Sequence, residues 1–498
     1  MKISAAWTLS AAVWCASTAH AAPSLGTDQL SLSTGSGLDT LTLGLSTKLS
    51  SAFVRLFHSA SGDAGAQTED KTIWEVITTS DEFSQLAHIL NYSSDATKDV
   101  LKHSKHLTLF APLNWHHHRD SDDAEAYADL SFGPASIQTF TQIERQIDEY
   151  EREYAVNDKD KDGDKEKKRE LIRHLIDAHA MYHLVRSDVE LDAKTIADNS
   201  SVATWLNTGK AHANNDGTDW RVRTGKSLLP LPAVYLNFYS RVVKPDMRAE
   251  NGLIHAIKYP LIIPPDVLQS LFFGQTTFST TTSALQKVHA EKYLSYRPYA
   301  HHHNHHHQKA GGLKEGHNVT GVAAETVFVP TNLAWSRLPW AFRAYLFSPW
   351  GYHLLQKVLM LHSLPHDIVY ADFVHHISHS HKSMVTVKGG ANKTSYTFDT
   401  VLPAIDGSKG QETVDVDVYR YHLLPGGRGP LQTRMVVQNV SVILQDIPAS
   451  NGVFHAIDKF IKPKGHPDKG IWAEVAHEAS IAGFGSVDLH AQAEAALW

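Results

Sequence analysis

The sequence predicts an α+β fold that is built twice along the chain. Segments 109–114 (LFAPLN) and 327–332 (VFVPTN) are similar, and each is followed by a second similar segment, NGLIHAI at 251–257 and NGVFHAI at 451–457. In each copy helical patterns gather in the first half and strand patterns toward the end, an order typical of α+β folds rather than of alternating βαβ units. Such a repeat indicates the architecture before any single motif does.

Further marks keep the same order in both copies although their spacing differs. From the proline to the central histidine the first copy runs 183 − 112 = 71 residues and the second 362 − 330 = 32. Insertions of different length in a shared framework indicate surface loops. The additional marks are Phe83-Ser84 and Phe278-Ser279, which open helical patterns, and Tyr182-His183-Leu184 and Leu361-His362-Ser363, which lie between the two landmarks.

The first copy begins with a helical apolar period over 71–90. The period breaks near 78–81, where Ser80 or Asp81 can cap a second helix. The short apolar run 107–111 stops at Pro112, as a buried strand does before a turn.

The rest of the first copy predicts helix over 139–184 around a charged block, then paired strands at 234–243 and 253–263. Pro264 and Pro265 end this pattern and predict a stiff link. The predicted buried helix face comprises Ile172, Leu175, Ile176, His179 and Tyr182.

The second copy predicts helices at 278–288 and 352–361 and strands at 326–329, 414–421 and 433–444. In the helix 352–361 the inward residues are Leu354, Leu355, Val358 and Leu359.

Together these marks resemble the fasciclin domain family. Its members carry a buried strand ending in a Phe-Ala-Pro-Thr-Asn-like turn, a central Tyr-His motif and a closing Asn-Gly-Val-Ile-His-Val-Ile-Asp strand. Residues 451–458 match the closing motif nearly completely, whereas Lys258 replaces the usual aspartate and Leu361 the usual tyrosine. The resemblance implies two tandem fasciclin domains, each a twisted β-sandwich or wedge flanked by helices.

The N-terminus predicts an export signal, with Lys2, an apolar run from Ile3 to Ala16 and a small-x-small site before Ala22. An uncleaved anchor is the alternative. The predicted organisation is a signal peptide at 1–21, a poorly ordered leader at 22–69, a first domain at 70–265 with a charged insertion near 150–170, a second domain at 270–465 with a histidine-rich insertion near 295–316, and a tail at 466–498.

Charge and cysteine content exclude some classes of function. Removing the signal removes Lys2 and leaves a net charge of (46 − 1) − 53 = −8 with neutral histidines. That balance argues against a nucleic-acid partner, which requires a basic face. Cys15 lies inside the signal and is the single cysteine, so thiol chemistry and disulfides are not expected after cleavage.

Five Asn-X-Ser/Thr sequons are candidate N-glycosylation sites on exposed loops. One of them, Asn439, falls in the strand-like pattern 435–443, where a glycan must point outward. Val440 and Val442 would then face the core. The five candidates are Asn91, Asn199, Asn318, Asn392 and Asn439.

Histidine is unusually frequent, with 33 residues, and its densest run lies in the insertion of the second copy. Neutral imidazoles bind zinc, copper or nickel, but a flexible tract lacks the fixed spacing and outer-shell partners of an evolved site. We therefore predict no metal site, and a solvated low-complexity loop is the simplest interpretation. The weak metal candidates are His301, His302, His303, His305, His306 and His307; His116, His117, His118, His375, His376, His379 and His381 are interpreted with the same caution.

Signatures of catalysis are incomplete. Residues 158–163 match the first half of a calcium loop, but Arg169 occupies the twelfth position, where a bidentate Glu is needed. Gly225-Lys226-Ser227 resembles the end of a phosphate loop, yet Trp220 occupies the place of its first glycine. We predict no catalytic residue and no cofactor. An enzyme stays an open third class, because distant histidines and carboxylates can converge in a fold.

The resemblance implies that Tyr182, His183 and His362 are candidate binding-motif residues in adhesion. The alternative is that they are hydrogen-bonded core residues. The predicted function is a secreted, glycosylated, non-catalytic protein of cell adhesion or of matrix or cell-surface organisation, with a cell-surface or matrix protein or glycan as partner. The alternative is a luminal or membrane-anchored vacuolar protein with a trafficking or compartment role, which contacts a membrane only if the signal is uncleaved.

Overall fold

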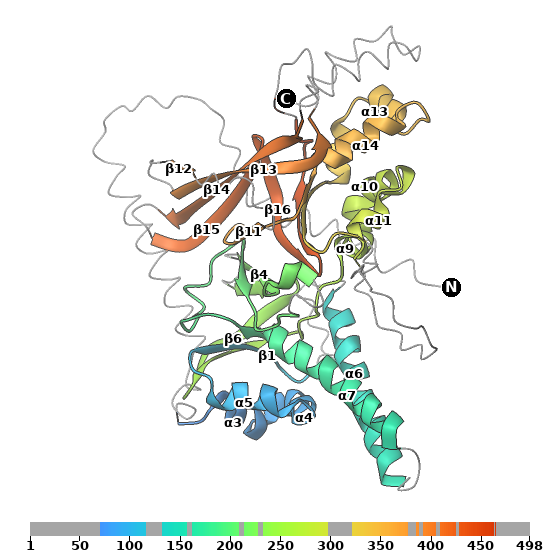
Figure 1. The fold of residues 1–498 in the computed structure, drawn as a ribbon. Helices are drawn as coiled ribbons and strands as arrows, with labels where there is room; N and C mark the ends of the chain where they lie inside the picture. The colour runs from blue at the N-terminus through green and yellow to red at the C-terminus, as the bar shows by residue number, and fades with distance from the viewer. Residues whose placement is uncertain are drawn as a thin grey trace, which may run out of the picture. The chain divides into compact units, whose positions relative to one another are not determined.

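The computed structural model describes residues 70–115, 132–156, 162–208, 214–227, 233–296, 321–376, 385–387, 392–404, 409–424, 428–462 and 464 (Figure 1). Several predictions fall outside the described residues: the signal peptide 1–21, the leader 22–69, the tract 301–307, Asn318 and the tail 466–498.

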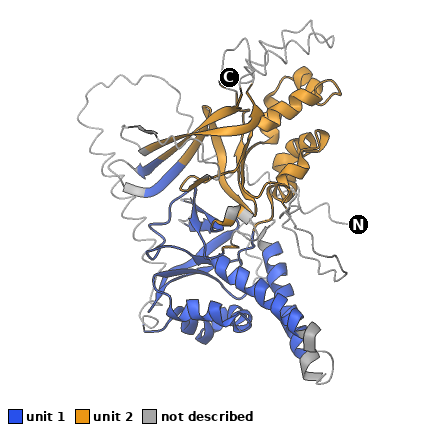
Figure 2. Cartoon of the chain, viewed as in Figure 1, with its two compact units in different colours: residues 1–206, 219–263, 420–433 blue, residues 207–218, 264–419, 434–498 orange. Residues whose placement is uncertain are grey.

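The chain divides into two compact units (Figure 2). The first unit comprises residues 1–206, 219–263 and 420–433, and the second comprises residues 207–218, 264–419 and 434–498. Each unit is described by itself below.

A seven-stranded sheet organises the first unit, with its strands in the order β2-β1-β7-β6-β5-β4-β3. Its one parallel pair is β1 (Leu107–Pro112) with β7 (Gly252–Ile257), and the other neighbours are antiparallel. The remaining strands are β2 (Leu184–Val185), β3 (Ser200–Ala203), β4 (Arg221–Ser227), β5 (Ala233–Leu236) and β6 (Ser240–Ala249).

An eight-stranded sheet has the order β12-β13-β14-β15-β16-β17-β8-β9, and its parallel pair is β8 (Glu325–Pro330) with β17 (Gly452–Ile457). Read from β9, seven of its strands follow the order of the first sheet position for position, and β12 is additional. The fold is therefore α+β and repeated. The remaining strands are β9 (Ser363–Pro365), β12 (Val385–Val387), β13 (Asn392–Pro403), β14 (Gln411–Leu424), β15 (Arg428–Val437) and β16 (Val440–Ala449), with β10 (Asp367–Val369) and β11 (Val374–His376) in a separate two-stranded sheet.

Helices precede the closing strands in both units, as predicted. The first unit contains α3 (Ile73–Thr79), the 3₁₀ turn η1 (Asp81–Phe83), α4 (Ser84–Asn91), α5 (Asp95–His103), α6 (Phe132–Val156) and α7 (Asp162–His183). The second contains η3 (Asn214–Gly217), α9 (Val267–Phe273), α10 (Gln275–Lys287), α11 (Glu291–Leu294), α12 (Asn332–Arg337), α13 (Trp340–Leu346) and α14 (Tyr352–Leu361).

The parallel pair of the first unit is buried on both faces, which explains its continuous apolar sequence. Successive side chains of a strand point to opposite faces. Leu107, Leu109 and Ala111 accordingly pack with apolar residues of α3, α4 and α5, while Phe110 packs with those of β4, β5 and β6. One face of the β1–β7 pair thus packs against helices, and the other packs against side chains of β4, β5 and β6.

Both parallel pairs place a glycine against the backbone of the first strand. An added Cβ on Gly252 would lie 2.1 Å from the carbonyl oxygen of Leu107. An added Cβ on Gly452, whose φ is +136°, would lie 1.9 Å from the carbonyl oxygen of Glu325. The glycine of each closing motif is therefore required by the close approach of two strands.

Two predicted strands are in fact hairpins. Residues 234–243 contain a turn with positive φ at Asn237 (46°) and Phe238 (71°), and residues 433–444 contain one at Gln438 (45°) and Asn439 (64°). Apolar residues resume directly after each turn, so the run resembles one strand although the buried positions change from Met435 and Val437 to Val440 and Val442 across the second turn. Paired positive φ values match the tight turns that suit the twist of a hairpin. The predicted strand 253–263 likewise ends at Ile257.

Other predictions for single elements divide between confirmed and wrong. All four inward residues predicted on α14 are buried, so that helix face is confirmed. On α7 four of the predicted face residues are buried, but Leu175 is 37% exposed. The helix break near Ser80 is confirmed, although neither Ser80 nor Asp81 caps α4 through its side chain; the amide of Asn114 serves that helix end instead.

Gly452→Ala is expected to lower the free energy of unfolding by at least about 2 kcal/mol, because the new methyl group meets the backbone of Glu325 at a strained φ. Urea unfolding measures the change. Gly410→Ala is the matched control, since a Cβ there has nothing within 4 Å, and its effect should stay within about 0.5 kcal/mol. Equal stability of the two variants would contradict the close approach.

Candidate functional site

The polar residues that recur in both copies build the same hydrogen-bonded framework in each unit. Asn251 Oδ1 accepts from the backbone N–H of Ile73 at 2.8 Å, and Asn451 Oδ1 accepts from that of Val267 at 2.9 Å. Both bonds satisfy an amide at a helix start, where no intrahelical partner exists. Each asparagine therefore ties the closing strand to a helix start, that of α3 in the first unit and that of α9 in the second.

A second asparagine pair follows the prolines that end β1 and β8. Asn114 Nδ2 donates to Asp81 O at 2.7 Å, and its Oδ1 accepts from Gln85 N–H at 3.1 Å. Asn332 repeats this geometry on α10, with Nδ2 donating to Thr276 O at 2.9 Å and Oδ1 accepting from Thr280 N–H at 2.9 Å. The sequence pattern did not predict these roles, although asparagine is a polar residue that both copies keep.

Histidine in each closing strand joins two backbone segments. His455 Nδ1 accepts from Asp446 N–H at 3.0 Å, and its Nε2–H donates to Val369 O at 2.8 Å. His255 repeats the pattern with Asp246 N–H at 3.2 Å and Leu191 O at 2.8 Å. Because an amide only donates and a carbonyl only accepts, these partners define the neutral tautomer.

His183 and His362, at the ends of α7 and α14, form a second bridge of the opposite tautomer. His362 Nδ1–H donates to Val358 O at 2.7 Å, and its Nε2 accepts from Ile461 N–H at 3.0 Å. His183 does the same with His179 O at 2.7 Å and Leu261 N–H at 2.9 Å. Both rings are buried, and both nitrogens of each have protein partners.

Tyr182, the third binding-motif candidate, is also buried. Its hydroxyl donates to Arg221 O at 3.1 Å and accepts from Asn237 Nδ2 at 2.9 Å. The bond to Asn237 holds the hairpin turn between β5 and β6. In the described structure the three candidates thus occupy core positions and contact other parts of their own units.

Burial lowers the pKa of His183, His362 and His455 from 6.5 to about 4, because the charged imidazolium loses its hydration. Burial also lowers the pKa of His255. These rings are therefore neutral hydrogen-bond bridges at physiological pH.

The second unit adds a buried carboxyl pair that the first unit does not repeat. Glu325 begins β8 at the position that Leu107 holds in β1, and its Oε1 accepts from Asn451 Nδ2 at 2.9 Å. Asp266 caps α9 by accepting from Gln269 N–H at 2.8 Å. Burial, with the nearby charge of Asp266, raises the pKa of Glu325 well above 4.5.

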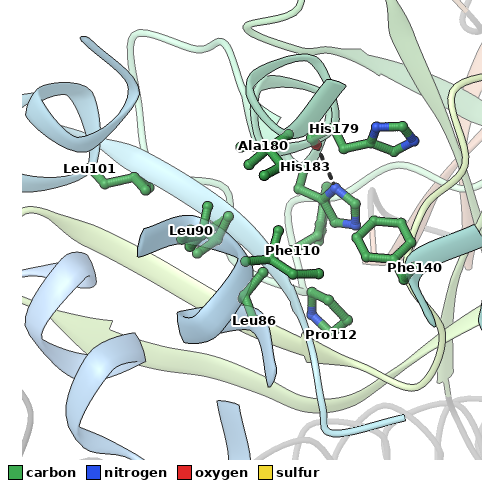
Figure 3. A pocket seen from close by; sticks show the side chains of 12 residues that line it. Leu86, Leu90, Leu101, Phe110, Pro112, Phe140, His179, Ala180 and His183 are labelled. Carbon is green, nitrogen blue, oxygen red and sulfur yellow. Dashed lines mark hydrogen bonds between the residues drawn. The ribbon is translucent and has the colours of Figure 1, made fainter. Parts of the chain in front are cut away.

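A small cavity in the first unit lies between α4, α5, β1, α6 and α7 (Figure 3). Phe110, Phe140 and Leu90 contribute to its apolar wall, and the rings of His179 and His183 lie beside Phe140. The volume that the centre of a water molecule can occupy in this cavity is about 20 Å³, which is room for about one water molecule.

Two glycosylation candidates are exposed: Asn91 at the end of α4, and Asn439 in the β15–β16 turn. Asn199 is half-buried, and its Oδ1 accepts from Arg223 Nη2 at 2.7 Å. Asn392 begins β13. His375 and His376, from the cautioned histidines, lie in β11.

Comparison with known proteins assigns the second unit. Residues 276–463 match the model of the fasciclin domain. The chain contains a fasciclin domain. Because the first unit repeats its strand order and its hydrogen-bonded framework, we assign the first unit to the same fold, so the chain carries a tandem pair.

Among solved structures, the chain matches a FAS1 domain pair from the insect cell adhesion molecule fasciclin I. The match covers 78% of this chain and 98% of that chain, at 13% identity and a TM-score of 0.27. No curated protein is similar to the chain at a significant level.

Fasciclin domains are generally non-catalytic adhesion domains, and fasciclin proteins are usually extracellular. Within the described part of the chain, every helix is too short or too polar to cross a bilayer.

His362→Gln in the second fasciclin domain is expected to flatten the dependence of stability on pH. The folded pKa is below the unfolded one, so wild-type stability is present above pH 6.5 and is lost as pH falls through 4. The contribution is (6.5 − 4) × 1.36, or about 3 kcal/mol. Urea unfolding between pH 7.5 and 4 tests this, with the exposed His353→Gln on α14 as control; identical pH profiles for wild type and His362→Gln would refute it.

Glu325→Gln is expected to have the opposite pH signature. The folded pKa is raised, so the stabilisation is complete below the unfolded pKa of 4.5 and is lost as pH rises toward the folded value. The neutral glutamine can still accept from Asn451, and the variant should gain stability relative to wild type as pH rises. Urea unfolding from pH 4 to 9 measures the difference, and Glu412→Gln, half-exposed on β14, is the control. A difference that does not vary with pH would rule out a buried, titrating Glu325.

Proposed function

We propose that this protein is a secreted, glycosylated fasciclin-domain protein that acts without catalysis in cell adhesion or in organising the matrix or cell surface. The observation that carries the proposal is the fasciclin match of residues 276–463, in a family associated with cell adhesion. The repeated histidines support the non-catalytic part of the proposal. They are neutral and buried, and both ring nitrogens of each are bonded to backbone groups rather than exposed to a substrate.

The proposed domains span 70–265 and 270–465. Their partner is a cell-surface or matrix protein or glycan, bound through exposed loops. A tandem pair suits such a role, since linking two weakly binding modules raises their apparent affinity through effective concentration. The binding-motif candidates Tyr182, His183 and His362 then act by holding the fold rather than by touching the partner.

Glycosylation is proposed first at the exposed Asn439. A residue at the tip of a two-residue hairpin turn presents its side chain away from the sheet, so a glycan there leaves the strand pairs intact. Asn91, exposed at the end of α4, is the second site favoured by its position.

Fractionation of expressing cells tests the proposal. A chain tagged after Trp498 is expected in the medium or on the cell surface, with its N-terminus at Ala22 and a glycan on the peptide that contains Asn439. Recovery in vacuolar membranes with residues 1–21 retained would overturn secretion and favour the vacuolar alternative.

Adhesion itself needs a separate readout. Beads coated with the purified full chain should bind cells or matrix, whereas beads coated with the urea-unfolded chain should not. Equal binding by both would refute adhesion through the folded domains.

A further inference from the structure

Three potential metal ligands meet on the surface of the first unit. His88 of α4 and Asp148 and Glu151 of α6 each offer a ligand atom, and these atoms all lie within 4.8 Å of one another. His88 is half-buried, whereas the two carboxylates are exposed. Residues this close can share one divalent cation.

The rotation of α6 is determined by packing, so this meeting is not an accident of flexible side chains. Phe140, Ile143, Ile147 and Tyr150 recur at helical spacing and are buried in one cluster with Ile89 of α4. Asp148 and Glu151 each directly follow a member of that stripe and lie three residues apart on one face of the helix. Packing therefore brings both carboxylates to the flank of α4 that carries His88.

The Glu151 carboxylate also accepts a hydrogen bond from a neighbouring side chain. The hydroxyl of Tyr92 donates to Glu151 Oε1 at 2.5 Å, and the Tyr92 ring lies edge-on to that of His88, with 6.4 Å between ring centroids. Hydrogen bonds of this kind orient a ligand and are typical of metal sites. Glu151 retains its second oxygen for a cation.

The donor set selects the class of cation. Calcium and magnesium prefer oxygen ligands alone, whereas one imidazole with two carboxylates suits zinc and related transition metals. Two carboxylates balance a divalent charge. Two arginines bring positive charge near the site. Arg169 of α7 interacts electrostatically with Tyr92, but it is also paired with Glu166 at 3.9 Å. Arg152 donates a hydrogen bond to the backbone carbonyl of Asp148.

We propose that His88, Asp148 and Glu151 form a zinc-binding site that fastens α6 to α4 in the first unit. Three protein ligands leave a fourth position for water or for a donor from a partner. The site is specific to this unit, because α6 lies in the stretch between Pro112 and His183, which is longer than its counterpart in the second copy.

Hydrogen exchange measured by mass spectrometry tests the proposal, because it reports on each segment of the chain separately. Zinc that binds to the histidine tract is therefore not mistaken for zinc at the proposed site. The full exported chain is stripped with a chelator and then exposed to Zn²⁺ or Mg²⁺. Zinc at about 100 times its dissociation constant should slow local-opening exchange in 84–92 and 132–156 by up to about 100-fold. Magnesium should leave both segments unchanged.

Variants separate binding at this site from other effects. His88→Asn and Glu151→Gln should each abolish the zinc-dependent protection, and Tyr92→Phe should raise the zinc concentration for half protection by about 10- to 100-fold. The matched control is His174→Asn on α7, which removes an exposed histidine 3.5 Å from Glu170. Among the residues that the structure describes, this pair has no third metal-binding side chain, so the variant should retain full protection.

The proposal fails if zinc does not protect these segments in the wild-type chain, or if it protects them equally in His88→Asn. Unchanged exchange of the metal-free variants elsewhere in the first unit establishes that they are folded.

Discussion

The close approach of two parallel strands is the constraint on which each unit depends. β1 with β7, and β8 with β17, pair in the same register over six residues, and the glycine that opens each closing strand lies against the backbone of its partner. A side chain at either glycine would separate the strands. The preceding asparagine then fastens the pair to α3 in the first unit and to α9 in the second, next to the glycine contact.

Neutral histidine suits the other joints of this framework because its two ring nitrogens can accept on one side and donate on the other. In each unit one histidine uses Nδ1 as acceptor and another uses Nδ1 as donor, so four rings connect backbone segments that no ladder joins. Full burial strengthens these bonds but makes protonation costly. Stability of both fasciclin domains is therefore linked to pH through the buried histidines that the two units share.

The two units differ where the shared framework allows it. Glu325 stands at the glycine contact of the second unit where the first unit has Leu107, and the long helix α6 brings two carboxylates beside α4 in the first. Both differences place ionisable groups next to features that the two units share, the glycine contact and the helix bonded by Asn114 or Asn332. The two domains thus share one core and differ in the ionisable side chains placed around it.

The sequence alone determined the repeat, the fold class and the strands at 107–111 and 326–329, because mostly apolar runs end at proline and a similar Asn-Gly segment follows in both copies; the parallel pairing with the closing strands came from the structure. The sequence also determined α14, whose apolar period is regular. Only the tertiary structure decided the hairpin turns at Asn237 and Asn439, since apolar residues lie close on both sides of each turn. It likewise decided which atoms His183 and His362 bond, and that His88 meets residues 60 or more positions away. Such contacts depend on how helices and strands pack in space, and local sequence patterns carry information about neighbouring residues alone.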